Sequence, residues 1–173
     1  MILSDKVLVA AVNGPAPGWG TSSLALSDLV YSSPDAFFFT PFVQWGLCAE
    51  ACSSLTFAKI MGHQKASALI LGGERMTAQE LESAGLITKI LPKENFLQDV
   101  LSVAHRISQL PPETLKFNKN LMMRTSRTEL LEANEVELRG LRERARASEC
   151  KTAIQTFAVE QERKKQQKSR AKL

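Results

Sequence analysis

Residues 6–20 read KVLVAAVNGPAPGWG, and this stretch decides the fold that we expect. Its first seven residues form a continuous apolar run without alternation, which is typical of a strand buried on both faces. A turn rich in glycine and proline follows, and the hydroxyl residues at 21–23 could cap a short helix. Residues 29–32 and 36–40 are further predicted strands. The order strand, turn, helix, strand predicts the βαβ arrangement of an α/β fold.

The chain beyond residue 50 is predicted to be mainly helical. Thr77 and Glu80 have the spacing of a capping box, with threonine at the N-cap and glutamate three positions later. Pro112 suits the first turn of a helix. Apolar spacing and glycine or proline stops predict the remaining elements. These are helices at 65–71, 77–85, 96–110, 129–145 and 150–165, and a strand at 86–91.

The composition favours one globular domain. The chain has 173 residues, of which 44% are hydrophobic, enough to build a core. Its formal net charge is +4, and residues 160–173 account for that balance with six Lys or Arg against two Glu. Aromatic residues and glycines are not interleaved with this charge, so a solvated helix end or a targeting tail is favoured over nucleic-acid binding.

Neither a membrane nor a metal is expected. The N-terminus has no long apolar segment, and no apolar run approaches the roughly 20 residues of a membrane span. The cysteines, Cys48, Cys52 and Cys150, are odd in number, which favours free thiols inside the cell. Cys48 and Cys52 are four residues apart, but His63 and His105 lie far along the chain, so a zinc site lacks ligands.

Five segments of the chain, taken in order, resemble the enoyl-CoA hydratase/isomerase (crotonase) superfamily. They are AAVNGPAPGWG (10–20), LSDLVYSSPDAFFFTPF (26–42), GLCAEACSSLTFAKIMG (46–62), KASALILGGERMTAQELESAGLITKIL (65–91) and LPPETLKFNKNLM (110–122). No single segment is decisive, but five with the right order and spacing are specific. The resemblance covers nearly the whole chain from about residue 6.

The resemblance implies an α/β crotonase spiral fold with a helical C-terminal region. Residues 1–110 would form a partial crotonase core, and residues 111–173 a helical oligomerisation region with a targeting tail. Crotonase domains carry a large β-block before the turn at Asn13, whereas this chain starts just before it. We therefore expect a fold that lacks its N-terminal β-block, and with it one oxyanion-hole amide and much of the CoA contact. Three explanations of this short chain remain open: a fragment, a short gene model and a truncated paralogue.

Within the superfamily the chain is most similar to peroxisomal Δ3,Δ2-enoyl-CoA isomerases, which implies conversion of 3-enoyl-CoA to trans-2-enoyl-CoA in β-oxidation. This reaction needs a base at C2, stabilisation of the enolate oxygen and return of the proton at C4, and one carboxylate can make both transfers. Glu50 matches the catalytic glutamate of the isomerases, and burial among its small apolar neighbours would raise its pKa. Spacing alone would favour a plain helix-start glutamate that interacts with the helix dipole.

The turn at Gly18-Trp19-Gly20 opens a predicted helix, so its N–H groups are unpaired and point outward. The resemblance places one oxyanion-hole amide at Trp19. A plain strand-to-helix turn would explain the glycines without any ligand. The two glutamates that hydratases of the family use for water correspond to Ser22 and Phe42 here, which disfavours hydration.

The chain ends in Ala171-Lys172-Leu173, a variant of the Ser-Lys-Leu peroxisome address. Chance could produce three matching residues, but the isomerase resemblance upstream favours a peroxisomal location and an import receptor as partner. The resemblance also implies an acyl-CoA thioester substrate, no cofactor, and a homotrimer or hexamer. Two alternatives stay open: an impaired, truncated paralogue that binds crotonase-type subunits, and an isomerase- or hydratase-like enzyme of fungal secondary metabolism.

Overall fold

A computed structural model describes residues 1–170, except for the side chains of residues 161, 164–166 and 168–170. The expected peroxisomal address, Ala171 to Leu173, lies outside the described residues. Within the described chain, no helix is both long enough and apolar enough to cross a membrane.

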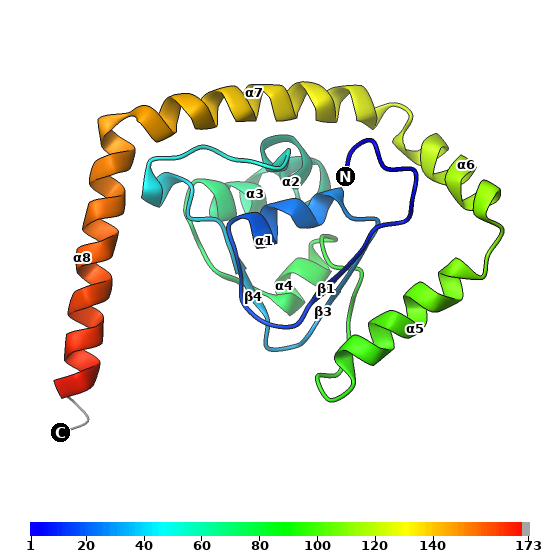
Figure 1. Cartoon of the computed structure of the whole chain (residues 1–173), viewed down its shortest axis with the longest axis horizontal. Coiled ribbons are helices and arrows are strands. Elements are labelled where there is room, and N and C mark those ends of the chain that lie inside the picture. The colour runs from blue at the N-terminus through cyan, green and yellow to red at the C-terminus, as the bar shows by residue number, and fades with distance from the viewer. Residues whose placement is uncertain (171–173) are drawn as a thin grey trace.

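Two small sheets form the centre of the molecule (Figure 1). The first has the order β1-β3-β6 and is parallel throughout; the second has the order β2-β4-β5, with β2 and β4 parallel and β5 antiparallel. The strands are β1 (Val9–Val12), β2 (Ala16–Pro17), β3 (Leu29–Ser32), β4 (Phe37–Phe39), β5 (Met76–Thr77) and β6 (Lys89–Ile90). A helical crossover joins β1 to its parallel neighbour β3, which confirms the predicted βαβ arrangement.

The first strand differs from its prediction. Only Val9–Val12 of the apolar run is a strand, and its residues are half-buried or exposed instead of buried on both faces. The reason is its place in the sheet: in the described part of the chain, β1 pairs with β3 alone and lies at the edge. The outer edge of β1 therefore has no strand beside it.

The helices largely follow the predicted pattern. They are α1 (Trp19–Ser22), α2 (Ser53–Met61), α3 (His63–Ile70), α4 (Ala78–Ser83), α5 (Phe96–Ser108), α6 (Pro112–Met123), α7 (Ser126–Arg146) and α8 (Ser148–Arg170), with 3₁₀ turns η1 (Ser23–Leu26) and η2 (Val43–Trp45). The capping box is confirmed, because the Thr77 side chain accepts from the Glu80 N–H and the Glu80 side chain accepts from the Thr77 N–H. The predicted cap at 21–23 is confirmed only in position: Ser22 is the N-cap residue of η1, but its side chain makes no capping hydrogen bond. The N-cap of α1 is Gly18, and the Thr21 hydroxyl donates to the Ala16 carbonyl.

The core lies between the sheets and helices α2, α3 and α4. Phe38, Phe57, Leu69 and Leu81 are completely buried there. Burying such side chains stabilises a fold by roughly 1.5–3 kcal/mol each. This packing gives a rigid base for the segments that lead into α1 and α2.

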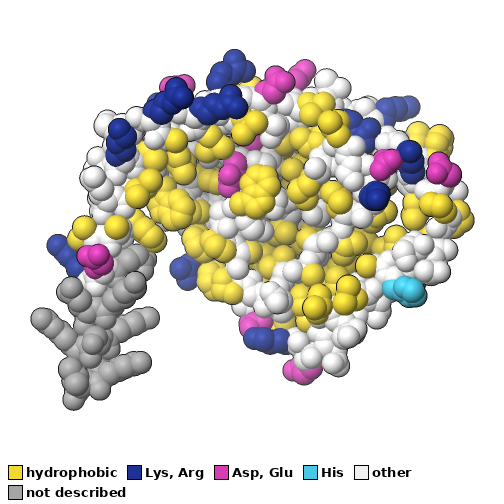
Figure 2. Space-filling model, viewed as in Figure 1, with side chains coloured by type: hydrophobic (Ala, Val, Ile, Leu, Met, Phe, Trp, Pro, Cys, Tyr) yellow, Lys and Arg dark blue, Asp and Glu magenta, His cyan; other side chains and the backbone are white. Residues whose placement is uncertain are grey.

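Helices α5 to α8 frame this centre on three sides (Figure 1). The Trp45 ring in η2 meets the Phe157 ring in α8 edge-on, with centroids 5.5 Å apart, and this contact joins α8 to the core segment. Figure 2 shows apolar side chains across the face that α7 and α8 border, and Lys and Arg along the outer side of α7.

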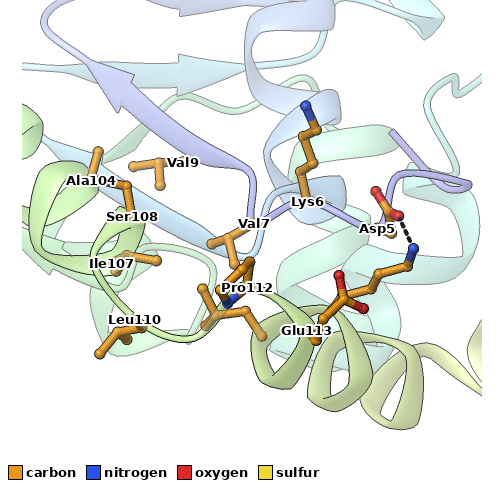
Figure 3. Close-up of a pocket in the computed structure, with 12 residues that line it drawn as sticks. Asp5, Lys6, Val7, Val9, Ala104, Ile107, Ser108, Leu110, Pro112 and Glu113 are labelled. Atoms are coloured by element: carbon orange, nitrogen blue, oxygen red, sulfur yellow. Dashed lines mark ion pairs between the residues drawn. The ribbon is translucent and has the colours of Figure 1, made fainter.

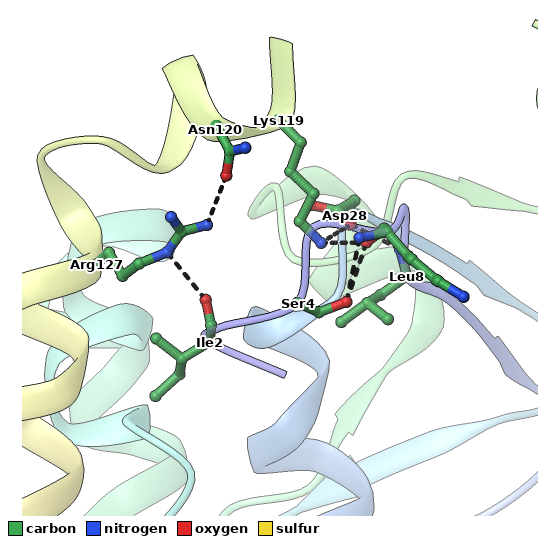
Figure 4. Close-up of polar contacts among 8 residues, drawn as sticks. Ile2, Ser4, Leu8, Asp28, Lys119, Asn120 and Arg127 are labelled. Carbon is green, nitrogen blue, oxygen red and sulfur yellow. Dashed lines mark hydrogen bonds and ion pairs between the residues drawn. The ribbon is translucent and has the colours of Figure 1, made fainter. Parts of the chain in front are cut away.

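Lys119 and Arg127 tie the C-terminal helices to the N-terminal segment and to the start of β3 (Figure 4). The Lys119 ammonium in α6 pairs with the Asp28 carboxylate at 2.8 Å and also donates to the Lys6 carbonyl. The Asp28 carboxylate accepts the Leu8 N–H at 2.7 Å as well. In α7, the Arg127 guanidinium donates to the Ile2 carbonyl. These bonds hold the start of β1 and β3 against α6 and α7.

Candidate active site

The turn before α1 places an open backbone N–H beside the sheet. Gly18 has a φ of +53° and a ψ of −117°, a conformation that favours glycine, and its N–H donates to the Phe39 carbonyl at 2.8 Å. This bond fixes the turn to β4. The Trp19 N–H, next along the chain, donates to no group in the described residues, as expected of the first N–H of a helix. The turn therefore offers a donor at the position predicted for an oxyanion-hole amide.

Glu50 lies in the segment between η2 and α2, where the backbone is strained. Ala51 and Cys52 both adopt left-handed conformations, with φ of 55° and 61°. Such non-glycine residues cost on the order of 1–3 kcal/mol each and persist only where surrounding contacts enforce them. The Ser53 N–H and hydroxyl both donate to the Glu50 carbonyl, at 3.0 and 2.7 Å, and supply part of that enforcement.

The Glu50 carboxyl is half-buried, and its pKa is raised above the ordinary value. Burial is the largest cause, followed by the negative charge of Glu137, while the nearby Ser22 hydroxyl acts in the opposite direction. A carboxylate with a raised pKa is a stronger base than an exposed one. This environment therefore favours Glu50 as a base for proton abstraction over Glu50 as an exposed glutamate at a helix start.

A cavity of about 350 Å³ lies beside these two segments. Trp19 and Ala51 both line it, whereas Glu50 itself is not among its lining residues; the cavity therefore brings Trp19 and the neighbour of the predicted base together. The remaining lining residues are mostly apolar: Met1, Ile2, Leu3, Leu26, Leu131 and Asn134. Trp19 is 56% exposed, so this lining residue also faces solvent. Such a cavity can accept an apolar group next to the segment that carries Glu50.

The positions of the hydratase glutamates hold groups of another kind. Ser22 is fully buried, and its hydroxyl lies 3.2 Å from the Gly18 carbonyl to which it donates. Phe42 is also buried. Neither side chain can act as a general base at neutral pH, so the site has the Glu50 carboxylate and no second carboxylate at these two positions.

A larger cavity, of about 460 Å³, lies elsewhere, between the open edge of β1 and helices α5 and α6 (Figure 3). Val7, Val9 and Ile107 line it, and the ion pair of Asp5 with Lys116, at 3.1 Å, borders it. It shares no lining residue with the cavity beside Trp19. This larger cavity is therefore separate from the candidate active site.

Glu137 is a buried residue near the site that the sequence did not lead us to expect. This glutamate in α7 is 6% exposed, and its carboxylate accepts the Cys52 N–H at 2.6 Å and the Ser54 N–H at 2.9 Å. A signal was available: Glu137 follows Leu130 by two helical turns, so an acidic side chain lies on the buried face of α7.

The cysteines are thiols without the features of a nucleophile. Burial raises the pKa of Cys48, and burial together with the Glu137 charge raises the pKa of Cys52 to about 11. The Cys52 thiol donates to the Leu130 carbonyl. The described residues contain no cluster of three or more His, Cys, Asp or Glu that could hold a metal ion.

Comparison with known proteins places this site in context. Residues 1–169 match the family model described as enoyl-CoA hydratase/isomerase. The chain is 40% identical over 154 residues to enoyl-CoA delta isomerase 2 of Rattus norvegicus, covering 89% of this chain and 39% of that protein. It is 38% identical over 152 residues to enoyl-CoA delta isomerase 3, peroxisomal, of Mus musculus, covering 88% and 48%. The chain thus spans less than half of the length of these two relatives.

A solved structure shows the same fold. The crystal structure of an enoyl-CoA hydratase/isomerase from Pseudoalteromonas atlantica T6c superposes with a TM-score of 0.87 at 32% identity. The match covers 90% of this chain and 63% of the bacterial chain. The α/β arrangement and the C-terminal helices are therefore those of the crotonase fold.

Proposed function

Because the chain belongs to the enoyl-CoA hydratase/isomerase (crotonase) family, we propose that it is part of an isomerase that converts 3-enoyl-CoA to trans-2-enoyl-CoA. The observation that carries the proposal is Glu50, a half-buried carboxyl with a raised pKa beside the cavity that Trp19 lines. The similarity to two enoyl-CoA delta isomerases supports the same choice.

In the proposed reaction, the Glu50 carboxylate removes a proton from C2 of the acyl thioester. The electron pair of the broken C–H bond moves into a dienolate, whose oxygen accepts a hydrogen bond from the Trp19 N–H. The C2=C3 double bond then forms as C4 takes the proton back from the Glu50 carboxyl, so the reaction consumes no water and no electrons. A preorganised oxyanion donor typically contributes about 3 kcal/mol to such a step.

Isomerisation fits the site better than hydration. Addition of water uses a pair of glutamates in the family, and Ser22 and Phe42 hold those positions here. A single carboxylate that shuttles one proton is sufficient for isomerisation. The apolar residues that line the cavity, Leu26 and Leu131 among them, suit an acyl chain.

We also propose that the C-terminal helices serve assembly. Large apolar side chains remain exposed on α6 and, at the other end of α7, on α8, and exposed apolar patches often mark sites of protein–protein interaction. They are Phe117, Leu121 and Met122 in α6 and Ile154, Phe157 and Val159 in α8. A trimer or hexamer of crotonase-type subunits would cover them. The division into a core at 1–110 and a helical region at 111–173 stays a prediction.

Substitution of Glu50 by glutamine tests the base. The assay uses a form of the protein extended by the N-terminal region that its relatives have, with trans-3-hexenoyl-CoA as substrate. Glutamine keeps the shape but cannot accept the C2 proton, so we expect turnover to fall at least ~100-fold. The control is Glu74→Gln, an exposed glutamate outside the cavity. Normal turnover in Glu50→Gln would remove this residue from the mechanism.

The peroxisomal address is tested separately. With a fluorescent protein at the N-terminus, we expect puncta that coincide with a peroxisomal marker, because the C-terminal tripeptide stays free for the import receptor. Deletion of residues 171–173 should give a diffuse signal. Puncta that survive this deletion would show that the tripeptide is not the address.

A further inference from the structure

Glu137 is a buried carboxylate that the proposed proton transfer does not use. It is 6% exposed, and in the described part of the chain no Lys or Arg forms an ion pair with it. Burial of a charge without a partner is costly, so hydrogen bonds must compensate. The compensation comes from the Cys52 and Ser54 N–H groups, at 2.6 and 2.9 Å, together with the positive end of the α2 dipole.

The two bonds enclose the segment that carries Glu50. Ser53, between the two donors, holds the Glu50 carbonyl with both its N–H and its hydroxyl. Ala51 and Cys52 are strained, so the segment needs an external contact to keep its conformation. The Glu137 carboxylate is such a contact, and it reaches the segment from α7, 87 positions along the chain from Glu50.

We propose that Glu137 is a positioning residue for Glu50: its carboxylate clamps the 50–54 segment to α7 and aims the catalytic carboxylate at the cavity. This inference rests on the proposed function. It makes α7 part of the active site, since Leu131 and Asn134 of the same helix line the cavity.

The clamp also acts through its charge. Burial is the main cause of the raised pKa of Glu50, and the charge of the Glu137 carboxylate adds to it. The groups that act on Glu50 from the elements around it are Glu137 from α7 and the Ser22 hydroxyl from α1. On its own segment, the Glu50 charge in turn helps to raise the pKa of the Cys48 thiol, for which burial is the largest cause. Glu50 must be ionised to accept a proton, so the acid side of the rate profile reports its pKa. Removal of the Glu137 charge should move that side to lower pH.

The test compares Glu137→Gln with Glu135→Gln, the same change two residues away on the exposed face of α7. Glutamine has one acceptor oxygen instead of two and no charge. Hydrogen exchange, which requires no substrate, should become faster in the peptide covering residues 46–61 in Glu137→Gln and stay unchanged in Glu135→Gln. In the extended, active form, kcat should fall about 10- to 100-fold with KM changed less than about twofold, as expected for a misplaced catalytic group.

The outcomes separate this inference from the proposed function. Unchanged exchange at 46–61 together with an unchanged pH profile would overturn the clamp, even if Glu137→Gln melted at a lower temperature. Faster exchange together with full activity of Glu50→Gln would overturn the proposed base and leave the clamp standing. If Glu137→Gln does not fold, residue-resolved exchange in the unsubstituted protein decides: protected Cys52 and Ser54 amides support the clamp, and amides that exchange as fast as exposed loops overturn it.

Discussion

At the scale of single residues, Glu50 combines a proposed catalytic role with a cost to the fold. Its pKa is raised mainly by burial and then by the Glu137 charge, so the folded protein holds the proton more tightly than the unfolded chain. Between the unfolded and folded pKa values the unfolded chain therefore binds fewer protons, and stability falls as the pH rises through that window. At neutral pH the ionised Glu50 leaves the protein less stable than a neutral side chain would.

Glu50→Gln should therefore raise the melting temperature at pH 7 while it abolishes turnover. Glu50 is partly exposed and solvent screens its interactions, so we expect a gain of at most about 3 °C. The gain should vanish near pH 4, where Glu50 itself approaches neutrality. Circular dichroism melts at both pH values, with Glu74→Gln as the control, measure the effect. A lower melting temperature at pH 7 would show that the Glu50 carboxylate stabilises the fold.

At the scale of elements, one ion pair joins α6 to the starts of two strands. Lys119 is 7% exposed, and its ammonium bonds to the Asp28 carboxylate and to the Lys6 carbonyl. Asp28 in turn holds the Leu8 N–H. The neighbouring pair of Lys116 with Asp5 is half-exposed, so solvent weakens it.

Lys119→Met should destabilise the protein by about 2–3 kcal/mol, because it leaves the Asp28 carboxylate without its cation. Loss of one partner from a fully buried ion pair costs about 3–5 kcal/mol, and Asp28 is partly exposed. Lys116→Met, on the same helix, should leave stability nearly unchanged. Urea denaturation of both variants makes the comparison. Equal midpoints for the two variants would show that the Lys119 pair contributes nothing beyond an exposed one.

Local signals predicted the elements well, because each depends on near neighbours. The Thr77 capping box and Pro112 at the start of α6 are examples. The roles proposed for Glu50 and Trp19 come from the resemblance to the family, and the turn geometry at Trp19 follows from the glycines around it. Glu137 could not be placed, because its burial depends on how α7 docks on the 50–54 segment, a contact across more than eighty residues. The start of α1 at Trp19 agrees with the predicted turn at 18–20, but the predicted side-chain cap at 21–23 is not formed, because the Thr21 hydroxyl bonds to the Ala16 carbonyl instead.

At the scale of the whole molecule, the edge of β1 dominates the behaviour that we expect. Val7 and Val9 face the 460 Å³ cavity, and β1 pairs on one side only within the described residues. An unpaired edge with apolar side chains invites association with another chain. The chain also spans 63% of the bacterial structure that it matches, so the matched fold extends beyond it.

We therefore predict that the 173-residue chain alone is poorly soluble or oligomeric and has negligible isomerase activity. The described site offers one candidate oxyanion donor, the Trp19 N–H, and the lack of a second would cost about 100- to 1000-fold in rate. Extension by the N-terminal region of a relative should restore solubility and turnover on trans-3-hexenoyl-CoA. Size-exclusion chromatography and the isomerase assay on both forms test this. A short form that is monomeric, melts cooperatively and is fully active would contradict it.

The two tryptophans of the chain occupy different places, and this separates two optical signals. Trp19 lines the cavity beside Glu50, whereas Trp45 meets Phe157 of α8. A Trp45→Phe variant keeps only the indole of Trp19. Its emission wavelength and its quenching report whether an acyl chain has displaced water from the cavity beside it. A Trp19→Phe variant leaves the other, whose emission reports whether α8 stays docked. Ligand entry and helix docking can thus be followed by fluorescence in the same protein without any attached dye.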